Sequence, residues 1–182
     1  LKIANDGYIY LATAGEVDGN LSSQIFLNKI NSEGELVSSV DFGPVGYMQG
    51  NINDLKIDNE GSLIIAGGTW ATIPGSEEHS GLYSDPFIRK YVASPNPDIA
   101  WTKNLATGYY NETIYKLGIN DDNSIYFYGD FGSSLGHNPN GDGDQILGLV
   151  NYDPYVSLQA PELDVSVNLF GNAISWNHPD SL

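Results

Sequence analysis

The chain has 182 residues, with 23 acidic and 7 basic side chains, 12 tyrosines and no cysteine. This length and aromatic content favour one or two folded domains over a disordered acidic chain. A formal net charge of −16 argues against nucleic-acid binding and against docking on anionic lipid. The lack of cysteine excludes disulfides, zinc–thiolate sites and a thiol nucleophile. No apolar run reaches the roughly 18 residues of a membrane helix.

The chain opens with a motif that recurs twice, at starts 54 and 62 residues apart: LKIANDGYIYLATA from Leu1, LKIDNEGSLIIAGG from Leu55 and LGINDDNSIYFYGD from Leu117. Two columns of this alignment are apolar throughout: Ile3, Ile57 and Ile119, then Ile9, Leu63 and Ile125. Between them lie Asp6-Gly7, Glu60-Gly61 and Asp122-Asn123. Because Gly and Asn accept the positive φ of a tight turn, each unit is predicted to begin with two short antiparallel strands.

A second pair of strands follows in each unit, within Gln24–Val40, Asp85–Leu105 and Asp144–Leu158. Their first halves align as QIFLNKIN, DPFIRKYV and DQILGLVN, and each is followed by turn residues: Asn31–Gly34, Ser94–Asp98 and Asn151–Pro154. The runs Leu63–Ala66 and Ile125–Tyr128 are apolar at successive positions, so both faces of these strands are expected to be covered.

Four-stranded units buried on both faces are typical of propeller blades. We therefore predict an all-β fold: residues 1–159 form three four-stranded antiparallel blades of a partial β-propeller, with blades at about 1–54, 55–116 and 117–159. Propellers usually close with about 4–8 blades. The chain begins at Leu1 with neither an initiator Met nor a signal peptide. We expect a piece of a larger propeller, with one part of an assembly as the alternative.

The repeat resembles the SBBP family of bacterial β-propeller repeats. The middle unit carries the resemblance best, through Asp58, Gly61, Ala66-Gly67-Gly68-Thr69, Pro74-Gly75, Asp85-Pro86-Phe87-Ile88-Arg89-Lys90-Tyr91 and Trp101. The first unit keeps Asp6-Gly7 and the strand from Phe26 to Lys29 but lacks the Trp. The third keeps Asp144 and Asn151-Tyr152-Asp153 but loses the Phe and Lys. The resemblance implies a secreted or cell-surface bacterial protein with a scaffold or binding role.

The composition changes after Pro161. Residues Pro161–Asp180 contain an alternating strand, a Gly171-Asn172 turn and a second strand that ends at Trp176, which together predict a C-terminal β-hairpin. This segment resembles the opening strands of a fibronectin type III or immunoglobulin-like module. We therefore assign residues 160–182 to a linker and the first strands of such a domain. The alternative is that these strands cover the edge of the last blade.

The longest loops of the repeat lie between its second and third strands, at about Gly15–Ser23, Thr69–Ser84 and Phe131–Gly143. Blade symmetry places all of them on one rim, where propeller function is usually found. The ligand-binding candidates there are Trp70, Glu77, Glu78, His79, Tyr83 and His137, with Tyr109 and Tyr110 as further rings able to stack on sugars. The alternatives are packing between blades for the aromatic residues and solvated loop positions for the two histidines.

A metal motif stands out at Asn138-Pro-Asn140-Gly-Asp142-Gly143-Asp144. Side-chain oxygens at alternate positions followed by a glycine form the first half of a calcium-loop pattern. Asn138, Asn140, Asp142 and Asp144 are the candidate ligands for calcium or another hard cation. The ninth and twelfth positions, Ile146 and Leu149, depart from the pattern because they offer no side-chain oxygen. The alternative is a polar turn without an ion.

No catalytic fingerprint is present: the sequence contains no G-x-S-x-G, H-E-x-x-H, P-loop or Rossmann pattern, and spacing singles out no carboxylate pair. We therefore expect a non-enzymatic binding or scaffold module on the bacterial surface or outside the cell. Its partners would be a glycan or an extracellular protein, together with further blades or domains of the same polypeptide. The alternatives are a part of a polysaccharide-active propeller enzyme and a purely structural assembly protein.

Overall fold

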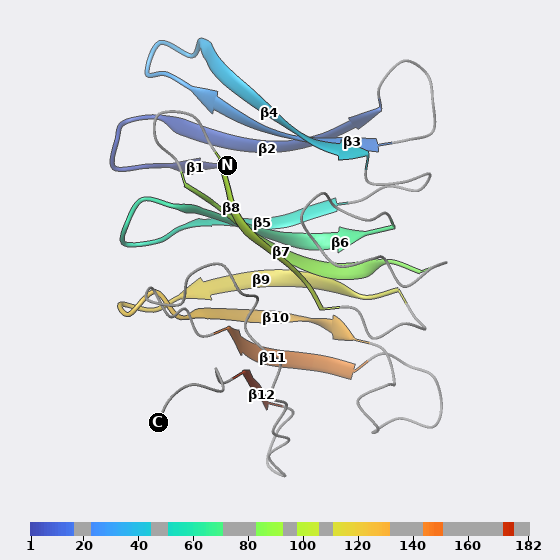
Figure 1. The fold of residues 1–182 in the computed structure, drawn as a ribbon. Helices are drawn as coiled ribbons and strands as arrows, with labels where there is room; N and C mark the ends of the chain where they lie inside the picture. Colours follow the sequence, from blue (N-terminus) through green and yellow to red (C-terminus); the bar gives the residue numbers. More distant parts are fainter. Residues whose placement is uncertain are drawn as a thin grey trace.

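A computed structural model describes residues 1–16, 23–44, 51–70, 83–92, 98–105, 111–131, 144–150 and 173–176. Within these ranges the regular structure consists of strands alone, arranged in three sheets that lie one above another (Figure 1). None of the described residues belongs to a helix that is long and apolar enough to cross a bilayer. The prediction of an all-β fold is confirmed.

The first two sheets follow the predicted order of strands. The first contains β1 (Lys2–Ile3), β2 (Ile9–Glu16), β3 (Ser23–Ile30) and β4 (Leu36–Pro44), and the second contains β5 (Asn51–Ile57), β6 (Leu63–Thr69), β7 (Asp85–Val92) and β8 (Asp98–Asn104). In both sheets sequential strands pair antiparallel. Each of these units is therefore a four-stranded meander.

The third sheet departs from the prediction at its last strand. β9 (Thr113–Ile119), β10 (Ile125–Phe131) and β11 (Asp144–Val150) pair antiparallel as expected. The fourth strand is β12 (Ala173–Trp176), which pairs parallel with β11, so this sheet is not antiparallel throughout. The fourth strand predicted in Asn151–Leu158 lies outside the described residues, as does the first half of the predicted C-terminal hairpin. The position of β12 agrees with the alternative in which the tail covers the last sheet's edge.

The opening hairpin has one geometry in all three units. The apolar columns of the sequence alignment face each other as cross-strand pairs: Ile3 with Ile9, Ile57 with Leu63, and Ile119 with Ile125. Each turn then places one residue in the left-handed region, at Gly7, Gly61 and Asn123, with φ of 82°, 81° and 65°. Residues with a Cβ rarely adopt such angles, and Asn is among those that tolerate them. The recurring Gly or Asn is therefore required by the turn.

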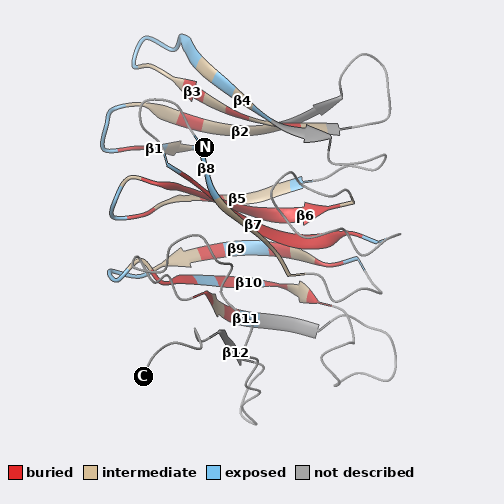
Figure 2. Cartoon of the chain, in the orientation of Figure 1, coloured by how far each residue is buried: buried red, intermediate tan, exposed pale blue. Residues whose placement is uncertain are grey.

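Two apolar cores lie between the sheets. The first joins sheets one and two through Tyr10, Leu27, Leu63, Ile65 and Phe87, among others, and the second joins sheets two and three through Ile64, Ala66, Ile88, Leu117 and Phe127, among others. Strand β6 alternates between the two cores, and all seven of its residues are buried (Figure 2). The prediction that both faces of this strand are covered is confirmed.

The same prediction is wrong for β10. Its residues alternate, with Ile125 and Phe127 buried and Tyr126 and Tyr128 exposed. The reason is position: the third sheet ends the stack in the described part of the chain, so only one of its faces meets another sheet.

Candidate functional site

The opening turns of the three units lie at one end, and the strand ends that the longer connections join lie at the other (Figure 1). The cross-strand pairs Glu16–Ser23, Thr69–Asp85 and Phe131–Asp144 close the sheets at this second end. We call this second end the loop rim. The second and third strands of every unit are joined there because all three units share the same order of strands.

Two of the predicted ligand-binding residues are described at the loop rim. Trp70 directly follows β6 and is partly buried, while Tyr83 shortly precedes β7 with 41% of its surface exposed. Both therefore flank the segment that connects these two strands. Glu77, Glu78, His79 and His137 lie outside the described residues, as do Tyr109 and Tyr110.

The predicted metal ligands are almost entirely outside the described part of the chain. Asn138, Asn140 and Asp142 are not described, and Asp144 is described only as the first residue of β11, opposite Phe131. Among the residues that the structure does describe, no group of three or more His, Cys, Asp or Glu is placed to hold a metal ion. The calcium prediction therefore stays a prediction.

A seam of hydrogen bonds holds the second and third sheets together beside the loop rim. The Glu112 amide donates to the Ser84 carbonyl at 2.8 Å, and the Ser84 hydroxyl donates to the Glu112 carbonyl at 2.9 Å. The Asn53 amide group donates to the Thr113 hydroxyl at 2.9 Å and to the Ile114 carbonyl at 2.8 Å. These bonds fix the strand ends from which Tyr83 and the rim loops leave.

Buried carboxylates accompany this seam. Glu112 is fully buried and Asp85 is 1% exposed, and the Asn104 side-chain amide lies 3.5 Å from Asp85 Oδ2. Neither residue stands in a spacing that predicts a site. Asp85 belongs to the repeat motif, and the burial of Glu112 arises from contact between units, which an alignment of single units does not reveal.

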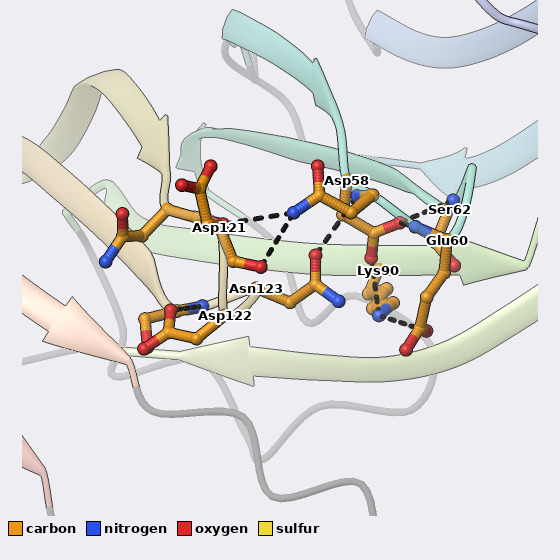
Figure 3. A network of polar contacts seen from close by, with 10 residues as sticks. Asp58, Glu60, Ser62, Lys90, Asp121, Asp122 and Asn123 are labelled. Carbon is orange, nitrogen blue, oxygen red and sulfur yellow. Dashed lines mark hydrogen bonds and ion pairs between the residues drawn. The ribbon is translucent and has the colours of Figure 1, made fainter.

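The opposite end holds a second polar network (Figure 3). Lys90 Nζ lies 2.6 Å from Asp58 Oδ2 and 3.8 Å from Glu60 Oε2. Asn59 connects the opening turns of the second and third units: its backbone amide donates to Asn123 Oδ1 at 3.0 Å, and its side-chain amide donates to the Asp121 carbonyl at 2.9 Å. These contacts connect the opening turn of the second unit to β7 and to the opening turn of the third unit.

The first unit has a related arrangement around Lys29, which aligns with Lys90. Lys29 Nζ lies 3.8 Å from Asp6 Oδ2 and 4.0 Å from the centroid of the Tyr8 ring. Tyr10 donates to Asp6 Oδ2 at 3.0 Å, and burial together with this carboxylate raises the pKa of Tyr10. In both units, a lysine in this column of the repeat and an acidic residue in the opening turn are the sequence features that form this ion pair.

A buried cation lies on the face of the second sheet that packs against the first. Arg89 is 1% exposed; its Nε donates to the Thr102 hydroxyl at 2.7 Å, and the guanidinium lies 5.9 Å from the Tyr91 ring centroid. Burial lowers the pKa of Arg89 and raises that of Tyr91. The group belongs to the core between sheets and not to the loop rim.

Comparison with known proteins gives no family assignment. No family model matches the chain, and no curated protein matches it significantly.

Proposed function

We propose that this chain is a binding or scaffold module of a secreted or cell-surface bacterial protein, built as part of a β-propeller of the SBBP type. Its ligand would be a glycan or an extracellular protein, bound at the loop rim. Three repeated sheets stacked face to face support the propeller architecture, because radial repetition of four-stranded sheets is its defining feature. Because Ala173–Trp176 pairs with β11, this strand would complete the third sheet, and a linker with the first strands of a fibronectin type III or immunoglobulin-like domain is the alternative for residues 160–182.

One observation carries the binding proposal: Trp70 and Tyr83 flank a rim connection whose strands are held by the buried second sheet. Aromatic rings offer flat apolar area beside polar edges and stack well on sugars. All of β6 is buried, as is β7 from Asp85 to Tyr91, so the two rings are attached to the most buried strands of the described chain. Attaching recognition residues to a rigid scaffold lowers the entropy lost on binding.

The test is a glycan array followed by calorimetry with the best oligosaccharide. Trp70→Ala and Tyr83→Ala are each expected to weaken binding about tenfold or more, consistent with roughly 1–3 kcal/mol for a lost aromatic contact. The control is Val92→Ala, which removes an exposed apolar side chain at the end of β7 away from the loop rim. Equal affinity of the unchanged chain and all three variants would refute the loop rim as the binding site.

The alternative of a polysaccharide-active enzyme is examined with the same ligands. Reducing-end release from a bound polysaccharide by the 182-residue chain, abolished by Asp85→Asn or Glu112→Gln in a folded variant, would favour that alternative. Under the proposed function, binding occurs without cleavage.

A further inference from the structure

The two contacts between sheets use the same columns of the repeat. The first sheet presents Tyr10, Ala12 and Leu27 to the second, and the second presents the aligned residues Ile64, Ala66 and Ile88 to the third. The receiving faces also correspond, with Leu55, Ile57, Leu63 and Ile65 in the second sheet aligned with Leu117, Ile119, Ile125 and Phe127 in the third. The stack therefore has a direction. We call the face that a sheet turns toward the next unit in the chain its presenting face, and the face that it turns toward the preceding unit its receiving face.

The outer face of the first sheet is a receiving face. Its columns hold Ile3, Ile9, Leu11, Phe26 and Ile30, and the pairing of Ile9 with Ile30 and of Thr13 with Phe26 places them on one side of the sheet. Every one of these positions is also apolar in the second unit, where the face is covered. Here Ile3 is 70% exposed, and no sheet packs on this face in the part of the chain that is described.

The outer face of the third sheet is a presenting face. Tyr126 aligns with Tyr10, which is fully buried between sheets one and two, whereas Tyr126 is 38% exposed. Leu147 aligns with the buried Leu27 and is 56% exposed, and Tyr115 and Tyr128 are exposed beside them. Leu149 stands in the column of Lys29 and Lys90, so this column brings no buried lysine to the contact; the exposed Lys116, paired with Tyr128 on the same face, would lie within it.

We propose that these two faces bind each other between two copies of this chain, the outer face of the third sheet of one copy packing on the outer face of the first sheet of the other. Such a contact is heterologous, and it forms a closed ring if the rotation between copies allows. Propellers close with about 4–8 blades, and the three sheets formed by the described residues give six in two copies, which falls within that range. The number of copies rests on the proposed propeller architecture; the contact between the faces does not.

The test measures the mass of the intact 182-residue chain by sedimentation and light scattering. A dimer of about twice 19.7 kDa is expected. Because each copy carries a formal charge of −16, the dissociation constant should fall as salt is raised from about 0.05 to 0.5 M. A monomer at all concentrations would overturn the proposal, and open polymers would overturn the closed ring while supporting the contact.

Two charge variants distinguish this contact from a symmetric one. Leu11→Glu blocks the receiving face and Tyr128→Glu blocks the presenting face, so each variant alone should be monomeric. An equimolar mixture should regain a heterodimer through its one intact contact. If Leu11→Glu or Tyr128→Glu alone still dimerises, a symmetric contact between like faces replaces the proposed one. Ser32→Glu, in the exposed turn between β3 and β4, is the control for added charge, and circular dichroism verifies folding of all variants.

Discussion

Lys90 and Asp58 form an ion pair of 2.6 Å whose side chains are only 4% and 0% exposed. Asp58 lies in the opening turn of the second unit, where its Oδ1 also accepts hydrogen bonds from the amides of Glu60 and Ser62 at 3.0 and 2.7 Å. The carboxylate therefore holds the turn and the lysine at once. This connects the first hairpin of the unit to its third strand.

Replacing Lys90 with Met should strongly destabilise the protein. The substitution keeps much of the side-chain volume but leaves the Asp58 carboxylate buried without its cation, a loss that typically costs about 3–5 kcal/mol. The matched control is Lys56→Met, because Lys56 is 30% exposed in its 3.5 Å pair with Asp54 and should lose less than about 1 kcal/mol. Urea unfolding of both variants measures the difference, and equal losses would contradict the structural role of the buried pair.

Gly148→Ala should disrupt the core between the second and third sheets. A Cβ at this position would meet the ring of Phe127, which is almost completely buried and has little space to move. Overpacking of this kind costs about 1–3 kcal/mol. At Gly118 the nearest atom to an added Cβ is Tyr126 Cβ at 3.6 Å, an ordinary contact, so Gly118→Ala should change stability by less than about 1 kcal/mol. Thermal unfolding that ranks the two variants in the reverse order would show that the Phe127 ring is not confined as described.

The exposed tyrosine face should show an unusual titration at Tyr115. Its hydroxyl donates to Asp130 Oδ2 at 2.6 Å, and this hydrogen bond, followed by burial, raises the pKa of Tyr115 to about 12. Since the folded-state pKa lies above the ordinary value of 10.0, the associated stabilisation is complete below pH 10 and is lost as the pH rises toward 12. In Asp130→Asn the pKa should move back toward 10, as followed by NMR of ring-labelled tyrosine. Glu33→Gln, in a distant turn, is the control and should leave the Tyr115 titration unchanged.

Calcium should stabilise the chain if the loop from Asn138 to Asp144 binds it. Its alternating oxygens and following glycine favour a hard cation, with backbone carbonyls or water supplying the remaining ligands. The melting temperature should then rise with calcium concentration, because the ion binds only the folded state. Asp142→Ala should abolish this rise, whereas Asp18→Ala, in the corresponding loop of the first unit, should not. Calorimetry without calcium uptake at millimolar concentration would leave the segment an ordinary polar turn.

The order and register of the hairpins could be predicted from the sequence because they depend on local chemistry. The columns Ile3–Ile57–Ile119 and Ile9–Leu63–Ile125 face each other across the strands since a turn residue with positive φ follows at a constant spacing. The pattern of apolar residues then decides which face of each strand enters a core. These features need no knowledge of neighbouring units.

The exposure of Tyr126 and Tyr128 could not be predicted in the same way. Their run of apolar residues resembles Leu63–Ala66, yet burial requires a second sheet on that side, and the strand itself does not encode one. The bonds from Asn59 and Asn53 to the third unit could not be predicted for a related reason, because they join different units at positions about 60 residues apart, and an alignment of single units does not show contacts between units. The parallel position of β12 likewise depends on which sheet edge is open.

The burial of both faces of the second sheet has a consequence for how the chain unfolds. Within one copy of the chain, loss of either outer sheet would uncover apolar residues of β6, so the middle unit gains stability from both neighbours while each outer unit gains it from one. In the monomer this is a linear series of nearest-neighbour contacts, in which unfolding begins at the ends and the centre opens last. The three units are thus related in sequence but unequal in cooperativity, and the amide hydrogens of Leu63–Thr69 should exchange with solvent most slowly.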